Sequence, residues 1–494
     1  MKKYSLGSFI SLYIGENTYY YDTASNKIIK IPLKFKELLS EYITTGYNLF
    51  DENCNVDKNT LDEYKAWLAT MIKKGIFSKN PVTTIKHQLF DLCESYIEND
   101  LKSLLLQVTQ NCNLLCRYCG YAGYGVLDRQ HSNSNMSFDT AKKAIDFSFA
   151  NLKTKRKLVV SFYGGEPCAN FQLIQQCVDY INAKYYACAQ YNMTTNFTLV
   201  NDDMLTFFVK NNFLLTISID GPREITNAMR RYRYNGNGVF DTVYTNLSKL
   251  KRLYPEFYAN NVSFNAVIDP KYNYETIFDF FANDEVMKSN QVDFGIIDDS
   301  KNDYILDYSD EYILTYREKT LRDYINNLTY GTMKTNNSPD LFSDYFFNRS
   351  ITDSKRLSSC FHHSGPCVAG CTRLFVDING QLFPCEKASG LSKALIIGNV
   401  DEGINVDKVR SCLNLGSLSG DRCRNCWAMR LCSICAVNCD DIASDKLSVE
   451  AKHKCCIYQK ERAMQNLKNK CLLIDCQDIY KQMVDKEVKN GNKY

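Results

Sequence analysis

Short apolar runs alternate with amphipathic segments between residues 100 and 300. Segments such as 138–152 and 240–253 repeat apolar residues at helical spacing, whereas the runs between them are short enough to be buried strands. The predicted strands are 104–108, 158–163, 192–198, 214–219, 262–268 and 292–297. Strands that alternate with helices predict an α/β fold with a parallel sheet, either doubly wound or an incomplete barrel.

A different pattern precedes this alternation. Three β-type runs, 9–14, 18–21 and 27–31, are followed by two amphipathic helical patterns at 33–43 and 60–74. The sequence therefore predicts a small α+β module within residues 1–95.

The pattern changes again after residue 300. Residues 301–355 are rich in Asp, Tyr, Asn and Lys, and they predict a helical bridge. Cysteines crowd into residues 356–460, and the charged segment 461–494 predicts a C-terminal helix. With residues 96–300 as the α/β unit, these bounds predict five consecutive parts.

Composition narrows the expected setting. The chain has 494 residues and a net charge of +3 without a basic stripe, so nucleic acid is not an expected partner. No apolar segment approaches the roughly 20 residues that span a bilayer, and the start at Met1 lacks a signal-peptide cleavage site. We therefore expect a cytoplasmic protein without a membrane partner. Clustered cysteines in such a protein indicate metal sites.

Cys112, Cys116 and Cys119 form a CxxxCxxC cluster in the loop after the first predicted strand of the α/β unit. Three thiolates on one short loop suit an iron–sulfur cluster, because soft sulfur ligands favour this chemistry. A four-iron cluster held by three thiolates keeps one iron open to a small molecule. The alternative, a structural zinc site, needs a fourth ligand, and the nearest histidine is His131.

Other polar motifs follow successive predicted strands. Gly164 and Gly165 permit a close approach to the backbone, and Glu166 beside them can receive an ammonium group. The third strand ends in Thr195 and Asn196. In a parallel barrel the chemistry sits at this end of the strands.

The cysteine spacing, with Tyr118 just before Cys119, resembles the radical SAM superfamily. The resemblance implies a partial (βα)6 barrel of the TIM type, and a [4Fe–4S] cluster that binds S-adenosylmethionine. By resemblance, the cofactor-binding residues are Tyr118, Gly164, Gly165, Glu166, Thr195, Asn196, Ser218, Asp220 and Arg230. Arg231 and Arg233 compete with Arg230 for its place, and Thr226 stands where many relatives have His.

The Cys-rich region supplies more thiolates than one metal ion can use, although a zinc ribbon remains an alternative. Its spacing resembles the SPASM domain, which implies two auxiliary [4Fe–4S] clusters. One would be held by Cys423, Cys426, Cys432 and either Cys455 or Cys456. The other would be held by Cys360, Cys367, Cys385 and either Cys435 or Cys439.

Glu386 follows Cys385 at the place where related sulfatase-maturing enzymes carry a carboxylate that acts as a base. By resemblance it is the candidate catalytic residue, with a solvated surface Glu as the alternative.

Residues 1–95 resemble the winged-helix module that binds leader peptides in many peptide-modifying enzymes. Such a module adds the extended leader to a sheet edge. A DNA-binding wing and a structural cap are the alternatives. The expected partner is therefore a precursor peptide with a leader sequence, most simply one that contains Cys.

These resemblances imply a radical SAM peptide maturase. Reductive cleavage of S-adenosylmethionine would give a 5′-deoxyadenosyl radical, with electrons from a flavodoxin- or ferredoxin-type donor. Hydrogen abstraction from the peptide would then lead to a cross-link, for which we expect a Cys thioether. Alternatives are a carbon–carbon or carbon–oxygen cross-link, formylglycine formation in a sulfatase, and an iron–sulfur redox regulator.

Overall fold

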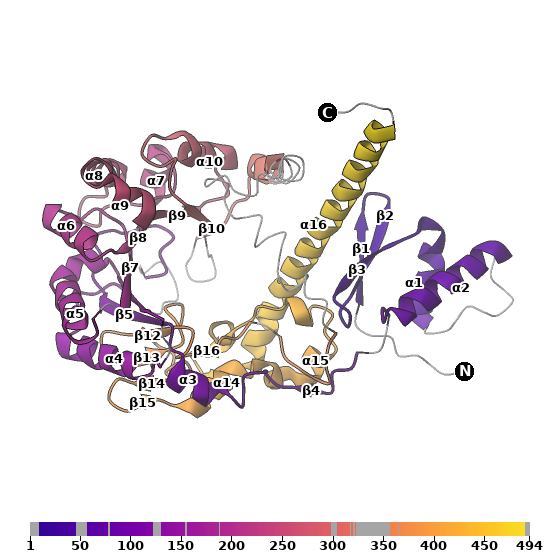
Figure 1. The fold of residues 1–494 in the computed structure, drawn as a ribbon, viewed down its shortest axis with the longest axis horizontal. Helices are drawn as coiled ribbons and strands as arrows, with labels where there is room; N and C mark the ends of the chain where they lie inside the picture. Colours follow the sequence, from indigo (N-terminus) through magenta and orange to yellow (C-terminus); the bar gives the residue numbers. More distant parts are fainter. Residues whose placement is uncertain are drawn as a thin grey trace.

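The computed structural model describes residues 9–45, 57–77, 80–121, 130–153, 156–186, 188–297, 304–316, 318–319, 322, 356–363 and 365–489. Figure 1 shows an arc of strands with helices on its outer side, and a long C-terminal helix that runs from this arc toward a small N-terminal unit. Most of the predicted bridge, 301–355, lies outside the described residues.

The six predicted strands form one parallel sheet in sequence order. They are β5 (Ser103–Thr109), β6 (Leu158–Gly164), β7 (Ala189–Thr195), β8 (Leu214–Ser218), β9 (Val262–Ile268) and β10 (Val292–Ile296). The connecting helices are α4 (Phe138–Ala150), α5 (Phe171–Lys184), α6 (Asp202–Lys210), α7 (Arg223–Met229), α8 (Phe240–Leu253), α9 (Pro255–Asn261) and α10 (Tyr274–Asn283). The predicted α/β partial barrel is confirmed.

Side-chain burial explains why these runs form a sheet. Leu104, Leu106 and Val108 of β5 are fully buried, and Leu105 between them is only 7% exposed. A strand covered on both faces reads as a continuous apolar run, as in parallel sheets flanked by helices. Polar caps then start the helices, since the side chains of Ser137 and Asn201 accept backbone N–H bonds at the starts of α4 and α6.

The Cys-rich region continues the same sheet. β12 (Leu374–Val376) pairs in parallel with β5, and β13 (Gln381–Phe383) follows it in antiparallel orientation. The short strands β14 (Gly398–Asn399) and β15 (Gly403–Ile404) complete a ten-stranded sheet. Because β5 pairs with β12 on one side, the barrel stays open, and Cys385 lies just beyond a strand of the shared sheet.

The rest of the Cys-rich region consists of short elements around its cysteines. They are β11 (Cys360–Phe361), which pairs with β4 (Thr84–Ile85), α14 (Val406–Leu413), η4 (Leu415–Ser419), α15 (Gly420–Arg424), η5 (Met429–Leu431), η6 (Ala436–Cys439), β16 (Asp440–Asp441) and β17 (Lys446–Leu447). The helix α3 (Cys93–Asn99) precedes β5.

The N-terminal unit contains the predicted strands and helices. β1 (Phe9–Ile14), β2 (Asn17–Asp22) and β3 (Lys27–Ile31) form an antiparallel sheet in that order. They are followed by η1 (Leu33–Phe35), α1 (Lys36–Thr45) and α2 (Lys58–Lys73). One sheet face packs on these helices and the other packs on the last helix, α16 (Val449–Lys489).

Helix α16 begins earlier than the predicted C-terminal segment 461–494, and its first turns carry Cys455 and Cys456. It therefore connects the Cys-rich region to the N-terminal sheet (Figure 1). Among the described residues, we find no helix with the length and apolar character needed to cross a bilayer.

Candidate active site and metal centres

The loop cysteines lie directly after β5, at the C-terminal edge of the sheet. Cys112 and Cys116 are each 9% exposed, and Cys119 is partly buried. Burial, with a smaller contribution from the neighbouring Cys119 thiol, raises the pKa of the Cys112 and Cys116 thiols to about 12. The three thiols thus lie close enough to influence the pKa of one another, which fits the predicted cluster.

A segment after α7 fixes the backbone of this loop. The N–H of Leu115 donates to Arg231 O at 2.8 Å, and the N–H of Arg117 donates to Met229 O at 2.9 Å. The cysteine loop is thereby tied to the end of the fourth βα unit, although it follows the first strand.

The paired glycines have a structural role that does not depend on a ligand. A Cβ on Gly164 would lie 2.2 Å from Thr109 O, and one on Gly165 would lie 2.3 Å from Asn111 O and 3.0 Å from Cys112 N. The end of β6 therefore packs against the backbone that leads into the cysteine loop. Only glycine permits this approach, so both positions control where Cys112 lies.

Glu166 is 1% exposed and is held by three hydrogen bonds. Its Oε1 accepts from Thr195 Oγ1 at 2.6 Å and from Cys168 N at 3.1 Å, and its Oε2 accepts from Asn196 N at 2.7 Å. Burial raises the pKa of this carboxyl group, against the lowering effect of the donors. The Cys168 thiol also interacts with this carboxylate, and the contact with the predicted ammonium group stays a prediction.

Asn196 connects the third strand to the cysteine loop. Its Nδ2 donates to Asn113 Oδ1 at 3.0 Å, and the side chain is 7% exposed. Ser218, at the end of β8, is 9% exposed. Both predicted cofactor-binding residues thus lie at the strand ends, and their cofactor contacts stay predictions.

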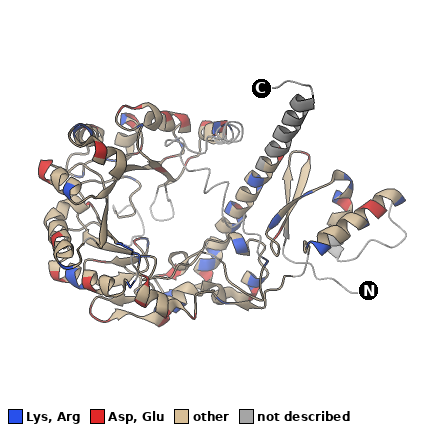
Figure 2. Cartoon of the chain, viewed as in Figure 1, with Lys and Arg blue, Asp and Glu red and all other residues tan. Residues whose placement is uncertain are grey.

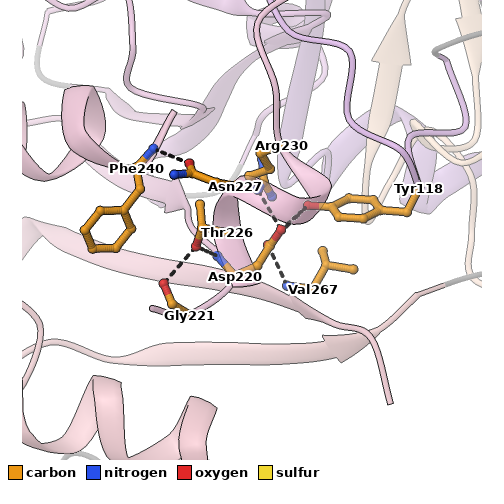
Figure 3. Close-up of polar contacts among 8 residues, drawn as sticks. All are labelled: Tyr118, Asp220, Gly221, Thr226, Asn227, Arg230, Phe240 and Val267. Atoms are coloured by element: carbon orange, nitrogen blue, oxygen red, sulfur yellow. Dashed lines mark hydrogen bonds and ion pairs between the residues drawn. The ribbon is translucent and has the colours of Figure 1, made fainter. Parts of the chain in front are cut away.

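Asp220 is the centre of a buried polar network (Figure 3). The fully buried carboxylate accepts from Tyr118 OH at 2.8 Å, from Arg230 Nε at 2.9 Å and from Val267 N at 3.1 Å. The Arg230 guanidinium lies 5.5 Å from the centroid of the Tyr118 ring. Two consecutive βα units and the cysteine loop therefore meet at one carboxylate.

The structure distinguishes the three neighbouring arginines. Arg230 is 6% exposed and pairs with Asp220, whereas Arg231 and Arg233 are exposed. Thr226, at the place where relatives have His, donates from Oγ1 to Gly221 O at 2.8 Å. It thereby closes the turn that carries Asp220 (Figure 3).

Four cysteines of the Cys-rich region form a first group. Burial raises the pKa of the Cys432 thiol to about 12, with contributions from the neighbouring thiols of Cys456, Cys426 and Cys423. Cys455 faces elsewhere, since its Sγ lies 3.4 Å from Asn438 O. Cys456 therefore lies in this group. Cysteine spacing alone had left Cys455 and Cys456 as alternatives for the same place.

A second group contains Cys367, Cys385 and Cys435. Burial raises the pKa of the Cys367 thiol, and the neighbouring thiols of Cys385 and Cys435 add to this effect. The buried Cys412, for which the cysteine spacing indicated no ligand role, also lies close to Cys367 and Cys435.

Two predicted ligands lie less close to this second group. The exposed Cys360 belongs to β11, with its Sγ 3.9 Å from Lys86 O. Cys439 is fully buried beside Cys455 and Cys435. In the part of the chain that the structure describes, no group of three or more His, Cys, Asp or Glu residues is arranged to hold a single metal ion.

Glu386 lies between the cysteine loop and the second group. Both of its carboxylate oxygens accept from Arg373 Nη1 at 2.8 Å, and its backbone O accepts from Tyr121 OH at 3.1 Å. Its side chain is 16% exposed, so it is neither fully buried nor a freely solvated surface Glu. Its role as a base stays a prediction.

Two residues lie close to cysteine sulfurs at positions that the sequence analysis did not predict. The His131 Nε2 lies 3.9 Å from Cys119 Sγ. Lys452, whose side chain is buried, donates to Cys423 Sγ at 3.1 Å. Its position four residues before Cys456 on one helix is the only sequence signal that could have found it.

The chain resembles known proteins over these same regions. Residues 106–282 match the radical SAM superfamily. An uncharacterized protein of Methanocaldococcus jannaschii is 39% identical over 144 residues, which are 29% of this chain and 46% of that protein, so the match spans less than half of this relative. The radical SAM cyclopropyl synthase TigE of Paramaledivibacter caminithermalis is 22% identical over 83% of this chain and 82% of its own.

A solved structure shares the fold. Native anSMEcpe, an anaerobic sulfatase-maturating enzyme, with bound AdoMet and the Cp18Cys peptide, superposes with a TM-score of 0.53 at 19% identity. The match covers 75% of this chain and 99% of that one. The match is therefore longer than the barrel alone.

Proposed function

The chain belongs to the radical SAM superfamily, and we propose that it is a maturase that cross-links a ribosomally made precursor peptide. The observation that carries this proposal is the convergence of Cys112, Cys116 and Cys119 in a loop that packs on Gly164 and Gly165 and is tied to the Asp220 network. Such a loop presents three thiolates at the end of a parallel barrel, where enzyme chemistry is built.

The three loop cysteines would hold a [4Fe–4S] cluster, and their mutual proximity fits this group. When bound with S-adenosylmethionine, the cluster supplies a 5′-deoxyadenosyl radical that takes a hydrogen atom from an unreactive C–H bond. The residues of the chain itself would bind and orient S-adenosylmethionine. The Glu166 carboxylate would receive an ammonium group, and Asp220 holds Tyr118 and Arg230 beside the loop.

The two groups in the Cys-rich region would hold the auxiliary [4Fe–4S] clusters. A thioether cross-link removes one hydrogen from the peptide thiol and one from a carbon atom, and it leaves one electron to be accepted. An auxiliary cluster is a suitable acceptor, and a flavodoxin- or ferredoxin-type protein is the proposed donor for the loop cluster. TigE and anSMEcpe, the relatives described above, suggest peptides or proteins as the substrate class.

The N-terminal unit supports the leader-binding part of the proposal. β3 is an edge strand of its sheet in the described residues, and a groove of about 530 Å³ runs beside it. The groove is lined by Asn26, Lys27, Ile28, Ile29, Lys30, Met71, Lys74, Ile76, Lys470 and Ile474. Figure 2 shows Lys and Arg along the described part of α16, which forms one wall. An extended leader with acidic and apolar residues would suit this groove.

The first experiment tests the enzyme class. The reconstituted protein, kept free of oxygen and given dithionite and S-adenosylmethionine, should release 5′-deoxyadenosine. Cys116→Ala should abolish the release, whereas Cys177→Ala, which alters a buried cysteine in the core of α5, should retain it. Absence of 5′-deoxyadenosine from the intact protein would refute the proposal.

The second experiment tests the substrate. A short Cys-containing peptide encoded beside the gene should lose two hydrogen atoms per cross-link, as measured by mass spectrometry, and thiol alkylation should show whether the Cys is consumed. A cross-linked peptide whose thiol is still free would indicate a carbon–carbon or carbon–oxygen bond in place of the thioether.

The third experiment tests the leader groove. Lys27→Glu with Lys74→Glu should weaken binding of a labelled leader, whereas Lys58→Glu at the far end of α2 should not. Equal binding by both variants would contradict a leader in this groove.

Formylglycine formation is the second candidate function, because Glu386 lies next to Cys385 and the fold resembles anSMEcpe. A sulfatase peptide needs no leader module. Full turnover of such a peptide after deletion of residues 1–95 would favour this alternative.

A further inference from the structure

Lys452 occupies an unusual place for a lysine. Its side chain is 1% exposed, in the second turn of α16, where it reaches toward η4 and α15. Its Nζ donates to Leu415 O at 2.9 Å, to Ser419 Oγ at 2.7 Å and to Cys423 Sγ at 3.1 Å. An ammonium group has three donors and no acceptor, so these three contacts satisfy it completely.

The charge of this ammonium group needs a partner. Removing an ion from water costs several kcal/mol unless an opposite charge compensates it. Within the described residues, Lys452 forms no ion pair with a carboxylate, and two of its three partners are neutral oxygens. The third, the Cys423 sulfur, is the only one that can carry a negative charge, as a thiolate.

The same helix carries a second member of this cysteine group. Cys456 follows Lys452 by four residues, so the two side chains lie on one face of α16, one turn apart. The Cys432 thiol has both Cys456 and Cys423 as neighbours. Lys452 therefore contacts one cysteine of the group and lies on the helix that presents another.

We propose that Lys452 is the buried counter-ion of the auxiliary cluster held by Cys423, Cys426, Cys432 and Cys456, and that it raises the reduction potential of this cluster. Uptake of one electron adds one negative charge to the cluster. A fixed cation in contact with a ligand sulfur stabilises that added charge, because water does not screen it there. The inference rests on the proposed function only for the presence of the cluster.

The test compares reduction potentials in full-length, reconstituted protein. We would monitor reduction by EPR in the wild type, Lys452→Met, Lys452→Gln and Lys452→Arg. Lys454→Met is the matched control, because Lys454 is exposed on the same helix. Iron content and 5′-deoxyadenosine release without peptide are measured on each protein. A loss of this release in all proteins would contradict the proposed function and not the role of Lys452.

Lys452→Met should shift one auxiliary signal to a more negative potential by at least the equivalent of tenfold in the reduction equilibrium, which is 59 mV for one electron. Lys452→Arg should restore most of the shift, and Lys454→Met should leave all signals in place. Unchanged potentials in a Lys452→Met protein that retains its iron would overturn the proposal.

A loss of one cluster in Lys452→Met is decided by the other two variants. Gln keeps a donor for the neighbouring oxygens without the charge, whereas Arg keeps the charge. The positive charge is the requirement if the Lys452→Gln protein retains the cluster at a lower potential. The same conclusion follows if Lys452→Gln loses the cluster while Lys452→Arg retains it. If Gln retains the cluster at the wild-type potential, or if Arg loses the cluster as Gln does, the lysine acts through packing and the proposal fails.

Discussion

The barrel site and the Cys-rich region hold their thiols in opposite electrostatic settings. Beside the cysteine loop, the buried Asp220 and Arg230 form an ion pair, and Asp220 also accepts from Tyr118 OH. In the first group of the Cys-rich region, the buried ion is Lys452, and its one partner able to bear charge is the sulfur of Cys423. The Asp220–Arg230 pair neutralises its own charges, whereas Lys452 directs a cation at a thiol.

This difference suggests a division of labour. The barrel network fixes the shape of a site that must also admit a small molecule, so its charges are committed to the scaffold. In the described part of the Cys-rich region, the Lys452 ammonium group contacts a cysteine sulfur instead, and we propose that it acts on the group that the cysteines hold. The predictions below test the contrast, in order of their expected effect on fold stability.

Replacing Asp220 should have the largest effect. Asp220→Ala leaves the Arg230 guanidinium buried without its partner and removes the acceptor for Tyr118 OH. Breaking a buried ion pair in this way costs about 3–5 kcal/mol. Thermal unfolding of the variant should show a clear fall in midpoint. Asp241→Ala, which breaks the exposed pair of Asp241 with Arg223, should cost about 1 kcal/mol or less. Similar costs for the two variants would contradict the buried network.

Gly165→Ala should have the next largest effect, and it is specific to the cysteine loop. The added Cβ would lie 2.3 Å from Asn111 O, so the backbone that leads to Cys112 must move. Overpacking of this kind costs about 1–3 kcal/mol. Iron content should fall by roughly four atoms of the roughly twelve expected for three clusters. Gly295→Ala is the control, because no atom lies within 4 Å of the added Cβ. An unchanged iron content in Gly165→Ala would show that this glycine does not control the position of the cysteine loop.

Motifs in the barrel could be predicted from sequence because each follows a strand. The order of the strands places Glu166, Asn196 and Asp220 at one edge, and the structure shows them there. What sequence could not give was the partner of each group. Nothing in the spacing shows that Glu166 accepts from Thr195, or that Arg230 is buried while Arg231 is exposed.

The Cys-rich region was harder to predict because its cysteines lie in short elements. Spacing left Cys455 and Cys456 equivalent, and only the rotation of α16 places Cys456 with Cys432. The continuous sheet through β5 and β12 was not predicted at all, since a pairing between strands some 270 residues apart has no local signal. Lys452 was missed for a similar reason, because burial of a lysine cannot be read from a charged helix.

His363 should make the Cys-rich side sensitive to acid. Burial lowers the pKa of its imidazole to about 2, with further lowering by His362 and Lys452, and neither ring nitrogen has a hydrogen-bond partner. The folded pKa lies below the unfolded value of about 6.5, so the stabilisation is present above that value and is lost as the pH falls. Between about pH 7.5 and pH 5.5, the loss should be about 1.4 kcal/mol. His363→Leu should lose less stability over this range in anaerobic unfolding, and an equal loss would contradict the burial of a neutral imidazole.

Glu386→Gln should have the smallest effect on stability and the most informative effect on chemistry. Its pair with Arg373 is partly exposed, since the Arg373 side chain is 45% exposed, and such a pair contributes at most about 1 kcal/mol. If Glu386 removes a proton from the peptide, the variant should lose modified peptide by about 10²-fold or more, the usual range for a general base. Release of 5′-deoxyadenosine should persist, because the Glu386 carboxylate is paired with Arg373 and follows β13, outside the strand ends that carry Glu166 and Asp220. Arg373→Gln removes the same ion pair and leaves the carboxylate in place, so it should retain more peptide modification than Glu386→Gln. Equal losses of peptide modification in the two variants would show that the Glu386 carboxylate acts only through its ion pair with Arg373.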